Sequence, residues 1–136
     1  MSARSLKHFT LFIILLFFSS CFSEADLGDG YYYLSYGNAI DNGYNEGSTI
    51  YKSPQKLCFQ TVLIQGGILE VNKSKDYILV GQNKQQKDSN EKTKVFYFWI
   101  INKQSSGVYG PFVSDEYENK KKELGVPESL KLKCEK

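Results

Sequence analysis

The sequence is poor in the residues on which many catalytic and metal sites depend. Among its 136 residues it has one histidine, His8, and one arginine, Arg4, both close to the N-terminus. The rest of the chain therefore cannot form Ser-His-Asp or Cys-His nucleophile systems, histidine zinc sites, or arginine clamps for phosphate. With three cysteines and no histidine beyond His8, a tetrahedral zinc site is not expected either. We expect no metal and no cofactor.

Long apolar runs are also scarce, and the clearest one covers residues 9–18. Arg4 and Lys7 precede this run, and two serines follow it. A basic start, an apolar middle and a small-residue end are typical of an export signal. Ten helical residues extend for about 15 Å, half the thickness of a hydrocarbon core, so a transmembrane helix is disfavoured. An ordinary secretion signal, cut for example after Ser23, is the alternative.

The residues after the apolar run resemble a bacterial lipobox. Phe18-Ser19-Ser20-Cys21 has small residues directly before a cysteine, although leucine is usual where Phe18 stands. A thioether lipid with two or more acyl chains, such as palmitate, holds a protein durably on a bilayer. We therefore expect a signal peptide at residues 1–20, lipidation of Cys21, and a polar tether at residues 21–30. The protein would face away from the cytoplasm, in the periplasm or on the cell surface.

The charge of the chain is balanced once the expected signal is removed. Loss of Arg4 and Lys7 leaves 15 basic and 15 acidic residues. A neutral chain lacks the positive footprint that nucleic-acid binding needs. The run Lys120-Lys121-Lys122 is interpreted as the solvated end of a helix, and nucleic acid is not an expected partner.

Two cysteines remain when Cys21 is assigned to lipid. Cys58 and Cys134 would lie in an oxidising compartment, where a disulfide can form and persist. In the chain-entropy model, a bridge between them would stabilise the folded state by about 4 kcal/mol. The sequence favours this pairing slightly, and the alternative is two separate buried thiols.

Residues 31–136 have the length of one globular domain with one hydrophobic core. β-rich runs alternate with turn signals, and paired glycines at Gly66-Gly67 predict a hairpin between residues 57–64 and 68–72. Residues 82–93 carry no apolar side chain and are expected to form a loop. Further strands are expected at residues 31–36, 48–52, 77–80 and 108–109.

The second half of the domain predicts a central strand and one helix. Residues 95–101 are apolar or aromatic throughout, which is typical of a strand covered on both faces. A helix should start with Ser114 as its N-cap and stop before Gly125 and Pro127. The expected fold is mainly β, of the α+β class: an antiparallel meander sheet of about six to seven strands with one C-terminal helix packed on it.

Carboxylates offer an enzymatic alternative. One carboxyl group with a raised pKa and one ionised carboxylate can cleave a glycosidic bond, so a cell-wall glycan hydrolase is a second hypothesis. Glu70 in a strand and Asp76 in a turn are its candidates, although charged residues on the wet face of a hairpin are the ordinary interpretation. Aspartates near glycines do not match the spacing of a calcium loop and more often shape turns: Asp26, Asp29 and Asp41.

Tyrosine is the one surplus in the composition that indicates binding. Tyr31, Tyr32 and Tyr33 put rings on both faces of one expected strand, and Tyr36 follows closely. Exposed tyrosines favour contacts with protein partners or sugars. The alternative is that these rings serve the core or the sheet surface. Three other residues are assigned to the core: Cys58, Phe98 and Trp99.

Several segments of the second half resemble one family of small bacterial proteins, the domain of unknown function 3997. They are residues 75–80 (KDYILV), 98–103 (FWIINK), 109–112 (YGPF), 116–117 (EY) and 122–126 (KELGV). The resemblance covers approximately residues 29–132. It implies a lipid-anchored or exported domain and a fold, and it carries over no catalytic residue.

These observations together predict a non-enzymatic, lipid-anchored protein of the cell envelope. Its membrane contact is Cys21, and its expected partner is another envelope protein or a small ligand held by the tyrosine-bearing face. An immunity-type protein that blocks a toxin is a special case of such a binder. The alternative is the carboxylate-dependent hydrolase described above.

Overall fold

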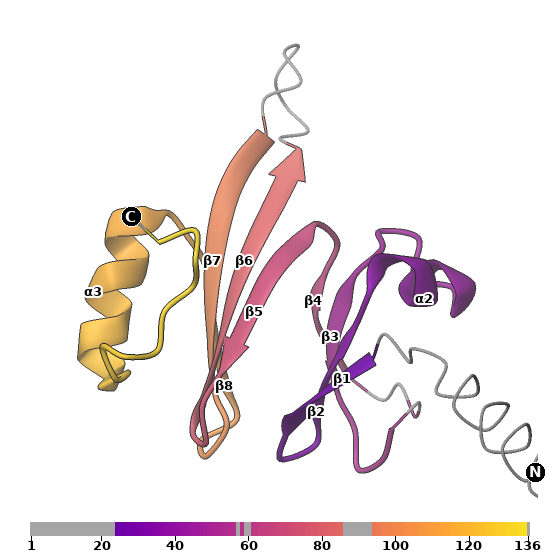
Figure 1. The fold of residues 1–136 in the computed structure, drawn as a ribbon, viewed down its shortest axis with the longest axis horizontal. Coiled ribbons are helices and arrows are strands. Elements are labelled where there is room, and N and C mark those ends of the chain that lie inside the picture. The colour runs from indigo at the N-terminus through magenta and orange to yellow at the C-terminus, as the bar shows by residue number, and fades with distance from the viewer. Residues whose placement is uncertain (1–23, 57, 59–60, 86–93, 136) are drawn as a thin grey trace, which may run out of the picture.

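The computed structural model describes residues 24–56, 58, 61–85 and 94–135, which form eight strands and two helices. The expected class, mainly β with a C-terminal helix packed on a sheet, is confirmed. The strands, however, divide between two antiparallel sheets of four instead of one meander (Figure 1). Sheet A consists of β1 (Glu24–Gly28), β2 (Tyr31–Leu34), β3 (Thr49–Lys52) and β4 (Thr61–Gln65). Sheet B consists of β5 (Ile68–Lys73), β6 (Tyr77–Gln85), β7 (Lys94–Asn102) and β8 (Gly107–Phe112).

The paired glycines connect the two sheets. Gly66 and Gly67 both have positive φ, 84° and 62°, as their sequence suggested. The hairpin predicted around them is nevertheless wrong, because β4 pairs with β3 and β5 pairs with β6. A Cβ on Gly67 would lie 2.0 Å from the carbonyl oxygen of Asn83, so only glycine lets the chain pass this close to β6. The turn therefore transfers the chain from one sheet to the other.

The main core lies between the sheets. Its buried side chains come from both: Leu27, Tyr31, Ile50, Ile64, Ile68, Ile78, Val80 and Ile101. Alternate residues of each strand point into this layer, as expected for strands that face each other across a sandwich. Burial of apolar surface on both inner faces is the main reason why the two sheets stay together.

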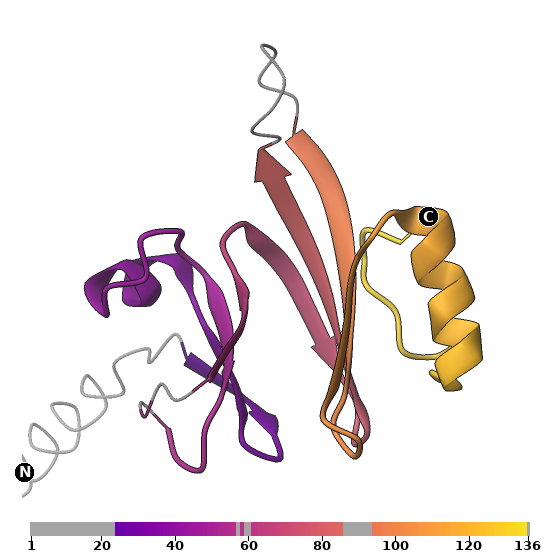
Figure 2. The same cartoon turned by 180° about the vertical axis from the view of Figure 1, so that it is seen from behind.

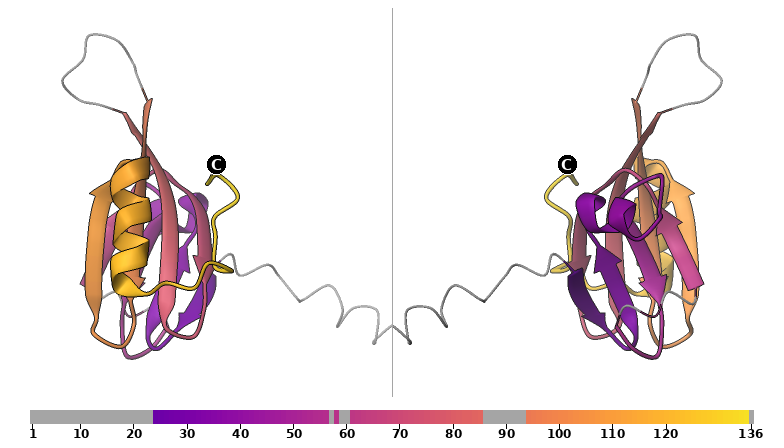
Figure 3. Two further views of the ribbon diagram at one scale, coloured as in Figure 1. Left: turned by 90° about the vertical axis from the view of Figure 1, so that its left-hand side faces the viewer. Right: turned by 90° about the vertical axis from the view of Figure 1, so that its right-hand side faces the viewer.

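Each sheet also has an outer layer. Helix α3 (Ser114–Leu124) and the C-terminal segment cover sheet B, and Figures 1 and 2 show both on its outer side. This layer buries Leu79, Phe98, Ile100, Tyr117, Val126, Leu130 and Leu132. The short helix α2 (Tyr36–Asp41) covers sheet A over a much smaller cluster of Leu34, Ala39 and Tyr51 (Figure 3).

The aromatic run of residues 95–101 forms the centre of sheet B, as predicted. Strand β7 lies between β6 and β8. Trp99 and Ile101 pack toward sheet A, whereas Phe98 and Ile100 pack toward α3. Phe98 is buried as expected, and Trp99 and Cys58 are only half-buried.

Several boundaries differ from those expected. Residues 24–28, placed in a tether, form β1 and pair with β2, so the sheet starts before residue 31. Tyr36 begins α2 instead of ending a strand. Residues 82–85, placed in a loop, extend β6, and residues 86–93 lie outside the described residues. Ser114 is the first helical residue, and Val113 occupies the N-cap position.

The lysine run of α3 is not uniformly solvated. Lys121 is buried, and its Nζ lies 2.7 Å from Oε2 of Glu135 and 3.8 Å from Oε1 of Glu118. The expected stop at Gly125 is present, with φ of 71° at the C-cap. Neither helix of the described part of the chain has the length and apolar character that a bilayer crossing requires. The predicted signal peptide, residues 1–20, and Cys21 lie outside the described residues.

Candidate functional site

The four candidate tyrosines do not form one binding face. Tyr31 is 1% exposed and belongs to the core between the sheets, so it cannot contact a partner. Tyr32 stacks on Tyr51 at 5.3 Å between ring centroids, on the outer side of sheet A. Tyr33 is half-buried, and Tyr36 is 67% exposed at the start of α2. Strand alternation places Tyr32 on the face opposite to Tyr31 and Tyr33, and Tyr36 lies beyond the strand, in α2.

Tyr33 lines a hollow at the open side of the sandwich, where β1 and β5 are the edge strands of the two sheets. The hollow has a volume of about 350 Å³ and includes Leu27 and Val71 as apolar walls. Burial raises the pKa of the Tyr33 hydroxyl, so this group stays neutral and can donate a hydrogen bond. We call this hollow the inner hollow.

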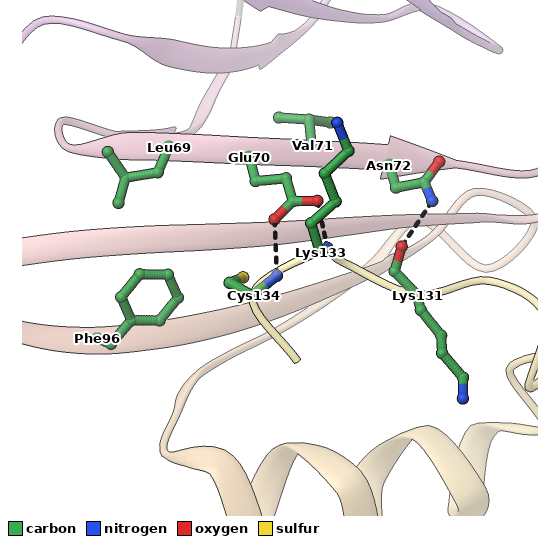
Figure 4. A pocket seen from close by; sticks show the side chains of 8 residues that line it. All are labelled: Leu69, Glu70, Val71, Asn72, Phe96, Lys131, Lys133 and Cys134. Atoms are coloured by element: carbon green, nitrogen blue, oxygen red, sulfur yellow. Dashed lines mark hydrogen bonds between the residues drawn. The ribbon is translucent and has the colours of Figure 1, made fainter. Parts of the chain in front are cut away.

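A second hollow lies on the other face of β5. It has a volume of about 480 Å³ and separates β5 from the C-terminal segment (Figure 4). Phe96 forms its apolar floor, and Lys131 and Lys133 lie along the C-terminal segment. We call it the outer hollow. The two hollows share residues 69–72, so β5 forms a ridge between them.

Leu69 stands out on this ridge. The pairing of β5 with β6 shifts between Ile68 and Glu70, which makes Leu69 the extra residue of a β-bulge. Its side chain is 62% exposed and lines both hollows. The sequence did not predict this residue, because a bulge breaks the alternation from which the inward and outward faces are inferred.

Glu70 holds the C-terminal segment against β5. Its carboxylate accepts a hydrogen bond from the backbone N–H of Lys133 and another, at 3.2 Å, from the backbone N–H of Cys134. Burial would raise the pKa of Glu70, but these hydrogen bonds outweigh it and hold the pKa below its usual value. Asn72 adds a second attachment, since its Nδ2 donates to the carbonyl oxygen of Lys131 at 2.7 Å.

The structure places Glu70 and Asp76 in different hydrogen-bond networks. Asp76 lies in the turn after β5, where its Oδ1 accepts Nε2 of Gln104 at 2.8 Å. Glu70 lines the two hollows, and its lowered pKa is the opposite of what a general acid needs. Asp76 lines neither hollow, so the two carboxylates do not face each other across either of them.

In the structure Cys58 and Cys134 are free thiols and not the expected disulfide. Cys58 lies between β3 and β4 of sheet A, near the side-chain amide of Gln55. Cys134 packs against sheet B, 3.2 Å from where a Cβ on Gly81 would be. Burial and the neighbouring Glu70 carboxylate raise the pKa of the Cys134 thiol to about 11, which makes it a poor nucleophile.

The aspartates near glycines shape turns. Asp26 Oδ1 accepts the backbone N–H of Gly28 at 2.8 Å, and Asp29 has a positive φ of 54° in the β1–β2 turn. Asp41 ends α2. Within the described residues, no three histidine, cysteine, aspartate or glutamate side chains gather as they would around a metal ion.

Lys103 is a buried residue that the sequence did not single out. Its Nζ donates to the carbonyl oxygens of Leu27 in β1, at 2.5 Å, and of Ser74 in the β5–β6 turn, at 2.8 Å. Burial lowers the pKa of this amine. A lysine after a strand normally points into solvent, so the residue type alone gave no signal of this linking role.

Comparison with known proteins gives one match. A family model described as "Protein of unknown function (DUF3997)" matches residues 31–136 and confirms the resemblance found in the sequence. No curated protein and no solved structure matches. The matched residues include every strand except β1, and both hollows lie mainly within them.

Proposed function

We propose that this chain, which belongs to the DUF3997 family of proteins of unknown function, is a lipid-anchored binding module of the cell envelope. It is anchored through Cys21 on the side of the membrane away from the cytoplasm, and it has no catalytic role. Its binding surface is the β5 ridge, and its partner is an extended segment of another envelope protein. The observation that carries this proposal is the exposed Leu69 between two hollows.

The position of the ridge favours a polypeptide partner. β1 and β5 are both edge strands, and edge strands recognise extended chains through backbone hydrogen bonds. The C-terminal segment lies beside β5 through side-chain bonds made by Glu70 and Asn72. Hollows of about 350 and 480 Å³ on the two sides suit apolar side chains of such a segment, which alternate in direction.

The charges around the ridge define the partner further. Lys131 and Lys133 line the outer hollow, and the carboxylate of Glu70 is already occupied by backbone amides. The surface therefore complements a segment in which apolar residues are flanked by acidic ones. Of the four tyrosines first considered, Tyr33 is the one that lines the inner hollow, beside the β5 ridge.

Site-specific photocrosslinking in living cells tests the binding surface. A photoreactive amino acid replaces Leu69 in the full-length protein, and the matched control carries it at Val62, another exposed apolar position. We expect a discrete crosslinked protein from position 69 that is absent at position 62. The adduct should weaken when Tyr33→Ala is added. Equal adducts at both positions, or none at 69, would contradict the proposal.

The lipid anchor has its own test. Cells are labelled with an alkyne-bearing palmitate analogue, and the parent is compared with Cys21→Ser. We expect label and membrane fractionation for the parent, and neither for the variant. An unlabelled parent that fractionates as the variant does would remove the anchor from the proposal and leave the β5 ridge to be judged by crosslinking.

A further inference from the structure

We infer that the α2 end of sheet A lies on the bilayer, with Tyr36 and Ile40 inserted into its interface. The inference rests on the proposed lipid anchor and goes beyond it, because an anchor alone does not say which surface of a domain touches the membrane. The occupant of this apolar surface is the bilayer that carries the lipid. The argument comes from chain length, strand register, exposed side chains and charge.

The anchor leaves the domain almost no distance from the membrane. β1 begins at Glu24, which is three residues after Cys21. Three residues of fully extended chain span at most about 11 Å. Glu24 therefore lies within about 11 Å of the lipidated residue, which is less than the length of a nine-residue strand at about 30 Å. The end of sheet A that contains Glu24 must face the bilayer.

The strand register brings α2 to that same end. Glu24 pairs with Leu34, the last residue of β2, and α2 begins two residues later at Tyr36. Paired Cα atoms lie about 5 Å apart, and two further residues add at most about 7 Å. The start of α2 is thus within about 12 Å of Glu24, comparable with the reach of the tether itself.

This end presents apolar side chains to solvent. Of the five large exposed apolar residues in the described part of the chain, two lie on α2: Tyr36 at 67% and Ile40 at 39%. They are four residues apart and share one face of the helix. The Tyr36 ring lies over Gly47 in the loop after α2. A Cβ on residue 47 would be 2.4 Å from the ring, so glycine makes room for it. Tyrosine favours membrane interfaces because its ring is apolar and its hydroxyl is polar.

The charges at this end favour an apolar contact over an electrostatic one. Glu46 pairs with Lys84 at 3.4 Å, and Asp41 is exposed nearby. This balance gives no attraction for anionic headgroups, so insertion of Tyr36 and Ile40 should not need an anionic lipid. Phosphatidylcholine is therefore the appropriate lipid for a test.

The opposite end of the domain would face away from the membrane. There, Nζ of Lys52, at the end of β3, donates to Oγ of Ser106 in the β7–β8 turn at 2.7 Å. Tyr77, the first residue of β6, lies at this end of the domain. Lys84 is seven residues further along the same strand, a distance of about 23 Å. Ser105 is exposed in that turn and serves as a distant reference position.

Depth-dependent fluorescence quenching tests the inference on the full-length, lipidated protein in phosphatidylcholine vesicles. Tyr36→Trp and Ile40→Trp place a reporter on α2, and Ser105→Trp places one at the far end, with the parent's Trp99 as background. Brominated phosphatidylcholine should reduce the added emission from positions 36 and 40 by roughly twofold. It should leave the emission from position 105 nearly unchanged.

Vesicle flotation separates the possible failures. If the protein floats with the vesicles but positions 36 and 40 are quenched no more than 105, the anchor stands and the membrane-facing α2 is refuted. If the parent does not float, the proposed anchor fails, and unquenched reporters then refute the inference as well. Two independent reporter positions on α2 guard against one variant that perturbs folding.

Discussion

The two sheets differ in how completely they are covered. Sheet B has strands of six to nine residues and is packed on both faces, by sheet A on one side and by α3 with the C-terminal segment on the other. Sheet A has strands of four or five residues, and its outer face carries only the short α2 over a small cluster. Burial on two faces stabilises sheet B more per residue than burial on one face stabilises sheet A.

Because of this difference, the surfaces that stabilise the fold are not those that we propose to contact a partner or a membrane. In sheet B the outer layer is fixed by apolar packing and by the Lys121–Glu135 ion pair. The exposed apolar residues Tyr36 and Ile40 lie on the thin outer layer of sheet A, and Leu69 lies on the edge strand of sheet B nearest to β1. The proposed contacts therefore use surfaces that the core does not need.

The largest expected effect comes from the connection between the sheets. Gly67→Ala would place a Cβ 2.0 Å from a backbone oxygen of β6 at a positive φ, and we expect a loss of about 4 kcal/mol in the free energy of unfolding. Gly125→Ala is the matched control, because φ is also positive but no atom lies within 4 Å. We expect that control to lose about 1 kcal/mol. Urea unfolding followed by Trp99 fluorescence measures both, and equal losses would contradict this account.

The outer layers give the next test. Ile100 is fully buried under α3, so Ile100→Ala should lower the free energy of unfolding by about 3 kcal/mol through lost burial and a cavity. Ile40→Ala, on the outer layer of sheet A, should change it by no more than about 0.5 kcal/mol. Urea midpoints measured side by side compare the two layers. A larger loss for Ile40→Ala would reverse the comparison between the sheets.

The ion pair of the outer layer predicts a pH dependence. Burial raises the pKa of Glu135, but hydrogen bonds from Lys121, Leu132 and Tyr117 outweigh it and hold the pKa below its usual value. A carboxyl group with a lowered pKa in the folded state contributes stability above its unfolded pKa. That contribution is lost as the pH falls through the folded value.

Glu135→Gln should therefore cost about 2 kcal/mol at pH 7, since it leaves the Lys121 amine with the more distant Glu118. The deficit relative to the parent should shrink as the pH is lowered from about 5 to 3, where the parent also loses the charge. Urea unfolding across this range measures it. A deficit that is constant with pH would show that the charge of Glu135 does not matter.

The smallest effect should come from the amine that links the sheets. Lys103→Met keeps the length of the side chain but removes the donor to Leu27 and Ser74, and we expect a loss of about 1 kcal/mol. Hydrogen exchange should accelerate in the β1–β2 and β5–β6 turns and remain slow in the centre of β7. Unchanged exchange in those turns would mean that other contacts hold this end of the sandwich.

The sequence predicted the parts of the fold that depend on local pattern. The apolar run of β7 required cover on both faces, and the structure supplies it from sheet A and α3. The stop of α3 at Gly125 follows from the freedom of glycine at positive φ. The family resemblance also held, over residues 31–136.

The features that the sequence missed depend on contacts between distant residues. Gly66-Gly67 had the turn chemistry of a hairpin, but local chemistry does not determine whether the next strand pairs with the last or crosses to another sheet. Likewise, Tyr31 and Tyr33 share one strand face, yet one ring enters the core and the other lines a hollow at its side. Leu69 became visible as a site only once the bulge of β5 was known.

The two sheets are joined near both ends of β5, by different means. Before β5 the chain passes between the sheets through Gly66-Gly67, and after β5 the amine of Lys103 donates to a carbonyl of β1 and to one of the β5–β6 turn. Two layers joined in this way resist sliding past one another, and the Nζ of Lys73, which donates to the carbonyl oxygen of Asp26 at 2.5 Å, adds a link across the flank between β1 and β5. A ligand that inserts side chains into this flank must separate two sheets that these links hold together. The thickness of the inserted side chains should therefore set its dissociation rate more than their number does.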